Sequence, residues 1–259
     1  MDNYNPFALV GKRILVTGAS AGIGRAIAVA CSRMGAVMVV TGRNQVRLDE
    51  TYHLLEGKGH QSQKADLSSE EDIATLVHDT PTLDGVVHCA GIGFRKPCKM
   101  LAFSDVDEVM SVNFKSSVCL QAALLKEKKV NKRSSIVFLA SRAAVSPSIG
   151  NSLYSASKGA LISYANCLAL ELAPRLVRVN CISPAMVWTD LILQGGLTKE
   201  DLEREQLKYP LKRYGTPEDV AHLAWFCLLY CLELSTSFCS LSSFSDIVSV
   251  LSFETTTLS

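Results

Sequence analysis

The sequence predicts an α/β fold in which one doubly wound parallel sheet carries helices on both faces. Short, β-branched apolar runs alternate with longer segments whose apolar residues recur at helical spacing. Helices between parallel strands form right-handed crossovers, which place them on the two faces of the sheet. The 259 residues contain no internal repeat and no linker, so we expect a single domain over residues 1–259.

The first half of the chain alternates strands and helices in order. Its expected strands are Arg13–Thr17, Val37–Thr41, His60–Lys64 and Asp84–Cys89. A helix over Arg25–Met34 stops at Gly35, because glycine commonly follows a helix end. A polar helix follows the second strand through about Gly57, and Ser68 is expected to cap a helix over Glu70–His78.

The second half continues the alternation. Two separate helices are expected, one around Asp105–Met110 and one over Lys115–Lys128. The strands are Ser135–Ala140 and Leu176–Ile182. Between them a long helix over about Ser152–Leu172 stops at Pro174, since proline cannot continue a helix interior.

Composition excludes several classes of protein. The 48% hydrophobic content and formal net charge of +1 rule out a disordered chain and favour no nucleic-acid partner. The longest apolar stretch, Val220–Leu232, is too short for a membrane span, and the first ten residues hold no signal-peptide core. We therefore expect a cytoplasmic protein with no membrane partner.

Cysteine and histidine spacing indicates no metal site. The nine cysteines form no C-x-x-C pair, and the five histidines show no ligand spacing. We expect reduced thiols that are mostly packed as small apolar side chains.

A glycine-rich loop is the first chemical signal. Gly18-Ala-Ser-Ala-Gly22-Ile-Gly24 lies between an expected strand and an expected helix. Gly18 permits a tight turn, Gly22 permits close approach of a pyrophosphate, and Gly24 permits close helix packing. The free N–H groups of the helix N-terminus then face the phosphates. The alternative is an ordinary glycine-rich turn.

Two motifs together carry a family resemblance. Thr17–Gly24 and Tyr154-Ser-Ala-Ser-Lys158 resemble the short-chain dehydrogenase/reductase family in its classical branch. Over residues 8–226 the chain is similar to 3-oxoacyl-(acyl carrier protein) reductases and tropinone-reductase-like enzymes. The resemblance implies a Rossmann-type dinucleotide-binding domain, a nicotinamide cofactor and a homo-oligomer, either dimer or tetramer.

The candidate catalytic residues are Asn113, Ser141, Tyr154 and Lys158. Tyr154 and Lys158 are four apart, so they share a helix face, and an ammonium lowers the pKa of a nearby phenol. We expect Tyr154 to act as acid or base and Ser141 to orient the substrate carbonyl. The resemblance implies that Lys158 also bonds the nicotinamide ribose and that Asn113 supports a water in a proton relay.

Cofactor choice follows from the end of the second strand. Thr41-Gly42-Arg43-Asn44 lacks the carboxylate that reads the ribose 2′-OH of NAD, and Arg43 suits a 2′-phosphate. We therefore expect NADP(H) in preference to NAD(H). The alternative is that Arg43 is a solvated residue at a helix start.

Further cofactor contacts are implied by the resemblance. The full expected set is Gly18, Ser20, Gly22, Ile23, Gly24, Arg43, Asn44, Asp66, Leu67, Ala90, Gly91, Tyr154, Lys158, Pro184, Val187 and Thr189. His88-Cys89 replaces the family's Asn-Asn, and Ala185 replaces its glycine after Pro184. Residues from about Leu191 to Tyr209 resemble the lid over the substrate. Their apolar members indicate a non-polar substrate, and the alternative is ordinary packing within the lid.

The end of the chain departs most from the family pattern. Gly215–Phe226 matches it, but no glycine follows Gly215 and no basic residue follows Arg213. The first 213 residues carry a charge of +6 and the last 46 a charge of −5. We hypothesise that residues from about 227 to 259 are a foreign reading, such as a frameshifted end. The alternative is a divergent tail in which Asp246–Leu251 forms a seventh strand.

Two functions therefore remain. The first is an NADP(H)-dependent oxidoreductase of a small-molecule ketone or secondary alcohol, with a 3-oxoacyl thioester as one candidate substrate and Tyr154 as acid/base. The second is a non-catalytic or impaired dinucleotide-binding protein whose altered tail spoils the site.

Overall fold

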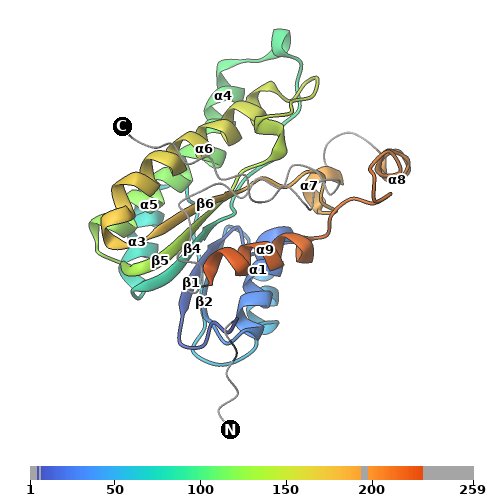
Figure 1. The fold of residues 1–259 in the computed structure, drawn as a ribbon. Helices are drawn as coiled ribbons and strands as arrows, with labels where there is room; N and C mark the ends of the chain where they lie inside the picture. Colours follow the sequence, from blue (N-terminus) through green and yellow to red (C-terminus); the bar gives the residue numbers. More distant parts are fainter. Residues whose placement is uncertain (1–4, 6, 194–197, 230–259) are drawn as a thin grey trace, which may run out of the picture.

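The computed structural model describes residue 5 and residues 7–193 and 198–229. They contain a six-stranded parallel sheet in the order β3-β2-β1-β4-β5-β6 (Figure 1). The strands are β1 (Arg13–Thr17), β2 (Val37–Gly42), β3 (Gln61–Lys64), β4 (Leu83–His88), β5 (Val130–Leu139) and β6 (Arg178–Ile182). The predicted fold class is confirmed. The altered tail beyond Leu229 and the expected strand over 246–251 lie outside the described residues.

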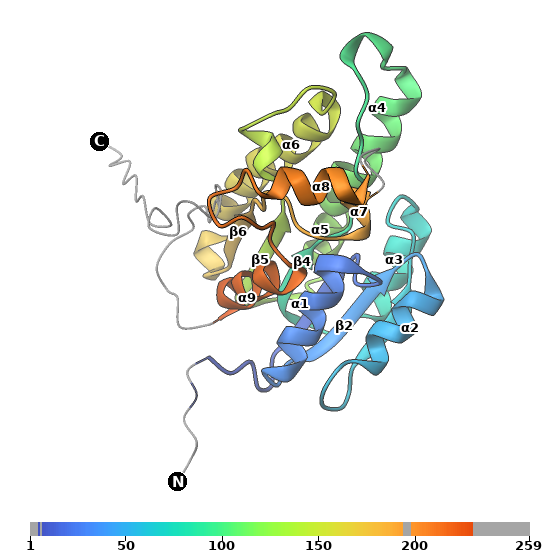
Figure 2. The ribbon, with the colours of Figure 1, turned by 90° about the vertical axis from the view of Figure 1, so that its right-hand side faces the viewer.

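Helices cover both faces of the sheet (Figures 1 and 2). One face carries α1 (Gly22–Arg33), α2 (Gln45–His53) and α9 (Pro217–Leu228). The other carries α3 (Glu70–Asp79), α5 (Ser116–Lys126) and α6 (Ser152–Leu172). Each layer has its own apolar core, one centred on Ile27 and Ala224 and the other on Leu120 and Leu161. Burial of these side chains on both faces explains why the strands read as continuous apolar runs.

The remaining helices lie over the carboxyl edge of the sheet or lead into it. They are α4 (Phe103–Met110), α7 (Asp190–Leu193) and α8 (Lys199–Gln206). Short helical turns are η1 (Cys98–Met100), the π-helical η2 (Ser111–Lys115), η3 (Arg142–Ala144) and η4 (Ala173–Arg175).

Two boundaries in the first half differ from the sequence prediction. Ser69, not Ser68, caps α3, because its Oγ accepts a hydrogen bond from Asp72 N at 3.2 Å. Ser68 Oγ donates instead to Asp66 Oδ1 at 2.7 Å. The helix expected through about Gly57 ends at His53, before the turn that leads to β3.

In the second half, one helix connection and two strand boundaries differ from the sequence prediction. The two helices expected around Asp105–Met110 and Lys115–Lys128 are joined, since η2 carries α4 into α5 without a break. The sixth strand begins at Arg178 rather than Leu176, because Leu176 adopts φ +57 at the end of η4. The fifth strand begins earlier than Ser135, at Val130.

The described cysteines are packed only in part as expected. Cys31, Cys181 and Cys227 are buried and Cys89 is half-buried, whereas Cys98, Cys119 and Cys167 are exposed. The exposed thiols lie on η1, α5 and α6.

His88 makes folding stability dependent on pH. Its ring is buried at the end of β4, stacks on Phe138 at 4.6 Å and places Nε2 2.9 Å from Gln121 Oε1. Burial lowers the pKa of His88 to about 4, against a weaker opposing effect of Gln121. The unfolded chain therefore binds a proton near pH 6.5 that the folded protein rejects until about pH 4.

We expect this one residue to remove about 2 kcal/mol of unfolding free energy between pH 7 and pH 5. The stability is fully present above pH 6.5 and is lost as the pH falls toward 4. Urea unfolding of wild type and His88→Asn at both pH values measures it. An equal loss in the two proteins would show that His88 does not titrate in this way.

Candidate active site

The glycine loop lies at the carboxyl end of β1, where the strand order reverses between β1 and β4. Gly18 and Gly22 adopt φ +64 and φ +52, a region that favours glycine. A Cβ on Gly24 would lie 2.3 Å from Gly18 O, and one on Gly18 would lie 2.9 Å from Ala90 Cα. The loop therefore packs so closely that only glycine fits at these positions.

The loop leads directly into the N-terminus of α1. Ala21 is the N-cap of this helix and provides no side-chain hydrogen bond, and no acidic residue occupies the first turn. The first N–H groups of α1 thus remain available to an anion. This arrangement fits the pyrophosphate of a dinucleotide, as the sequence predicts.

Thr17 joins the ends of β1 and β4. Its Oγ1 accepts hydrogen bonds from Cys89 N at 3.0 Å and from Ala90 N at 3.1 Å. This contact holds the Ala90-Gly91 backbone against the glycine loop. Burial raises the pKa of the Cys89 thiol to about 12, so the residue that replaces the family asparagine stays neutral.

Tyr154, Lys158 and Ser141 meet where β5 ends and α6 begins. Lys158 Nζ lies 5.8 Å from the centroid of the Tyr154 ring and donates to Leu139 O at 2.8 Å. Ser141 follows β5, caps η3 by accepting from Ala143 N at 3.2 Å, and also hydrogen-bonds Tyr154. The three polar side chains therefore face one region above the sheet edge.

The expected lowering of the Tyr154 pKa is wrong for this structure. Burial raises the pKa of Tyr154, although its hydrogen bond with Ser141 acts in the opposite direction. Lys158 is itself buried, and this burial lowers the pKa of its ammonium to about 8. Burial thus favours the neutral phenol of Tyr154, which is the form that can donate a proton.

Asn113 lies in the π-helical turn η2. Its Oδ1 accepts from Ile92 N at 2.7 Å, and its Nδ2 donates to Ile92 O at 3.0 Å and to Ser157 Oγ at 3.1 Å. A Cβ on Gly91 would lie 3.2 Å from Asn113 Oδ1 and 3.3 Å from Lys158 Nζ. Asn113 and Lys158 therefore flank Gly91, and Asn113 fixes the backbone that follows it. The water relay stays a prediction.

Arg43 and Asp66 lie near each other beyond the ends of β2 and β3. Arg43 is exposed, and its positive charge adds to the effect of Ser68, whose hydrogen bonds chiefly lower the pKa of Asp66. Asn44 caps α2 by accepting from Arg47 N at 3.0 Å. A Cβ on Gly42 would lie 3.1 Å from Ser20 Oγ. Arg43 thus directly follows the residue that packs against Ser20 of the glycine loop.

The other expected cofactor residues lie beside the glycine loop, in the segment after β6 and against the two apolar cores. Thr189 faces the glycine loop, since a Cβ on Gly22 would lie 3.3 Å from its Cγ2. Val187 pairs with Gly215 and is buried, and Pro184 O accepts from Arg142 N at 3.0 Å. Ile23 and Leu67 pack against the two apolar cores.

Arg25 holds the glycine loop in position, a role that the sequence did not predict. Its Nη2 donates to Ser20 O at 2.7 Å and Arg47 O at 3.0 Å, and its Nε donates to Thr51 Oγ1 at 2.9 Å. Thr51 in turn donates to Ala19 O at 2.8 Å. Arg25 thus ties α2 to the glycine loop; its position directly after Gly24 was the available signal.

Comparison with known proteins agrees with this geometry. The family model for short chain dehydrogenases matches residues 12–196. The chain belongs to the short-chain dehydrogenase family. Members of this family are oxidoreductases that use a nicotinamide cofactor, so the enzyme class predicted from the sequence is confirmed.

Relatives in this family cover most of the chain. A 3-oxoacyl-[acyl-carrier-protein] reductase FabG from Rickettsia felis is 31% identical over 218 residues, 84% of this chain and 89% of that protein. Human dehydrogenase/reductase SDR family member 4 is 33% identical over 227 residues, 84% of this chain and 81% of that protein. A solved short-chain dehydrogenase/reductase structure from Brucella melitensis, titled glucose/ribitol dehydrogenase, has a TM-score of 0.83 at 31% identity and covers 90% of this chain and 95% of that chain.

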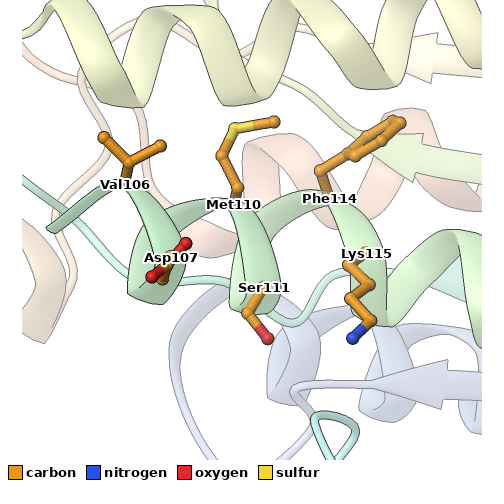
Figure 3. A pocket seen from close by; sticks show the side chains of 6 residues that line it. All are labelled: Val106, Asp107, Met110, Ser111, Phe114 and Lys115. Carbon is orange, nitrogen blue, oxygen red and sulfur yellow. The ribbon is translucent and has the colours of Figure 1, made fainter. Parts of the chain in front are cut away.

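A separate hollow of this short-chain dehydrogenase lies outside the active site. It measures about 380 Å³ and is lined by Val106, Asp107, Met110, Ser111, Phe114 and Lys115. Figure 3 shows Val106, Met110 and Phe114 pointing to one side of the helix and the polar side chains pointing to the other. None of the lining residues belongs to the predicted catalytic or cofactor set.

Among the described residues no helix is long and apolar enough to cross a membrane.

Proposed function

We propose that the protein is an NADP(H)-dependent oxidoreductase that interconverts a ketone and a secondary alcohol, with Tyr154 as the acid/base. The observation that supports this most is the grouping of Tyr154, Ser141 and Lys158 beside the glycine loop. A bound nicotinamide supplies or accepts the hydride. Ser141 holds the carbonyl oxygen, and neutral Tyr154 donates its proton to that oxygen during reduction.

The buried surroundings of Tyr154 set the resting protonation state of its phenol. A neutral phenol is the form that can give up a proton, and burial favours it over the phenolate. Lys158 returns a proton to Tyr154 after the reaction, and we propose that Asn113 takes part through the backbone it fixes at Ile92. Each of these roles concerns groups that already lie together before substrate binds.

A 3-oxoacyl thioester is one candidate substrate, because several relatives are named as 3-oxoacyl-[acyl-carrier-protein] reductases. The test is NADPH oxidation, followed by absorbance, with a 3-oxoacyl thioester and a panel of small ketones. Turnover of any member supports an active oxidoreductase. Tight NADPH binding with no turnover across the panel would instead favour the impaired dinucleotide-binding protein.

Arg43 is the residue that we propose selects NADP(H). Arg43→Ala is expected to weaken NADPH binding at least about tenfold and to leave NADH binding within about twofold, because only NADPH carries the 2′-phosphate. Arg33→Ala is the matched control: it removes an exposed guanidinium of α1 that pairs with Glu56 at 3.0 Å. Fluorescence titration measures both affinities. Equal weakening of NADPH and NADH would refute this role.

We also propose a homo-oligomer, a dimer or tetramer, that acts on a small-molecule substrate without nucleic acid or a membrane. Large apolar side chains exposed on α4 and α6 support it: Phe103 is 92% exposed and Leu170 is 77% exposed. Light scattering after size exclusion measures the mass. A mass of one chain at all working concentrations would contradict the proposal.

A further inference from the structure

Arg142 follows the predicted catalytic Ser141 directly, and its backbone is firmly held. Its N–H donates to Pro184 O at 3.0 Å. Its carbonyl accepts from Val145 N at 3.0 Å and from Ser146 N at 2.8 Å. The start of the Arg142 side chain is thus fixed between Ser141 and the loop that follows β6.

The guanidinium of Arg142 has an unsatisfied donor. Its Nη1 is buried and has no hydrogen-bond partner. Arginine stays charged in proteins, and a buried N–H without an acceptor costs free energy that folding normally avoids. Among the described arginines no other carries such an atom.

Other half-buried arginines of the chain show the usual outcome. Arg25 donates to Ser20, Arg47, Glu50 and Thr51. Arg175 Nη2 donates to Val130 O, in line with the general rule that buried donors are paired. The open donor of Arg142 is therefore an exception, and it occurs one residue from Ser141.

The charged groups around Tyr209 are Arg142 and Glu205, and the Glu205 carboxylate pairs with Lys208 at 2.6 Å. No ion pair within the described residues includes Arg142. A phenol is its titratable neighbour: burial raises the pKa of Tyr209, and the charge of Arg142 opposes that rise. Tyr209 also hydrogen-bonds the backbone of Met186. The guanidinium therefore lies near the segment after α8, which belongs to the region expected to cover the substrate.

We infer that Arg142 binds a carboxylate of the carbonyl substrate, so that the preferred substrate is a short oxo acid. Ser141 and Arg142 are consecutive at the start of η3, so both side chains leave the backbone at the carboxyl end of β5, where Ser141 is proposed to hold the carbonyl. A carboxylate accepts two hydrogen bonds from the arginine fork and neutralises its charge. This inference rests on the proposed carbonyl reduction, and it departs from the non-polar substrate that the lid residues favour.

Two probes that differ only in charge test the inference: acetoacetate and its methyl ester. We expect wild type to reduce acetoacetate with the higher kcat/KM. Arg142→Gln should lower kcat/KM for acetoacetate about tenfold to a hundredfold and change that for the ester less than about threefold. Arg142→Lys should restore part of the loss, because it keeps the charge. Arg33→Gln, which removes a distant positive charge, should change neither.

Binding gives a readout that does not depend on turnover. Calorimetry measures acetoacetate and methyl acetoacetate binding to the complex with NADP⁺, which cannot reduce them. Arg142-dependent preference for acetoacetate in both binding and turnover supports the inference. Arg142-dependent binding with no turnover of either probe or of any ketone in the panel would overturn the proposed function and, with it, the inference that a short oxo acid is the substrate. Reduction of the ester with no preference for acetoacetate would overturn the inference and leave the proposed function standing.

A structural role for Arg142 predicts a different pattern. It would lower kcat/KM for both probes alike in Arg142→Gln, or weaken NADPH binding and the melting temperature together. Either result overturns the inference. Unchanged NADPH affinity alongside selective loss of acetoacetate is the result that the geometry of Arg142 requires.

Discussion

Tyr154→Phe is expected to lower kcat for carbonyl reduction about 10²- to 10⁴-fold and to leave the Kd for NADPH within about twofold. The substitution removes the one hydroxyl that both hydrogen-bonds Ser141 and lies one helical turn from Lys158. Its ring stays in place, so the cofactor cradle formed by the glycine loop is unaffected. NADPH oxidation, followed by absorbance, and fluorescence titration measure the two quantities.

Tyr164→Phe is the matched control for this experiment. Tyr164 lies on the same helix, α6, and its ring contacts Phe114 and Phe138 edge-on at 6.4 Å and 5.7 Å. Loss of that hydroxyl removes no group near Ser141, so kcat should change less than about threefold. If Tyr154→Phe kept near wild-type kcat, or if Tyr164→Phe lost as much, Tyr154 would not be the proton donor.

Gly24→Ala is expected to raise the Kd for NADPH about a hundredfold and to lower the melting temperature. A Cβ there would lie 2.3 Å from Gly18 O and 2.7 Å from Gly18 C, which are backbone atoms that cannot rotate away. The glycine loop must therefore shift off the N-terminus of α1, and the phosphate-binding N–H groups lose their alignment. Titration with NADPH and thermal unfolding measure the two effects.

Gly159→Ala provides the control for adding a methyl group. Gly159 lies within α6, and a Cβ there would meet nothing within 4 Å. Because alanine is favoured over glycine inside helices, this variant should be about 0.5–1 kcal/mol more stable and bind NADPH normally. Normal NADPH affinity in Gly24→Ala would show that the loop is not the pyrophosphate site.

Local patterns predicted the fold well because the central strands are buried on both faces. The run Ile14–Val16 of β1 and the run Met38–Val40 of β2 lie between two helix layers, so apolar composition alone marked them. Helix boundaries were predicted less accurately where two neighbouring residues could each serve as the helix cap. Ser68 and Ser69 are both able to cap a helix, and only the position of Asp66 decides between them.

Sequence patterns did not predict the features that depend on how the folded chain packs. Asn113 lies in a π-helical turn, and Leu176 adopts a left-handed backbone conformation. Neither asparagine nor leucine is a residue type that predicts these conformations from the sequence. Spacing placed Tyr154 beside Lys158 correctly. It predicted the wrong sign for the pKa of Tyr154, since burial of the phenol outweighs the opposing effect of its hydrogen bond with Ser141. The unsatisfied donor of Arg142 likewise exists only once the chain has folded around it.

Transfer of deuterium tests the central claim most directly. The protein is incubated with NADPH deuterated at the nicotinamide C4 position and with the ketone that it turns over best, and the alcohol is analysed by mass spectrometry. An NADP(H)-dependent oxidoreductase places one deuterium on the carbinol carbon with one face of the nicotinamide labelled, and Tyr154→Phe places almost none. NADPH that binds but leaves every ketone unreduced and unlabelled would contradict the account.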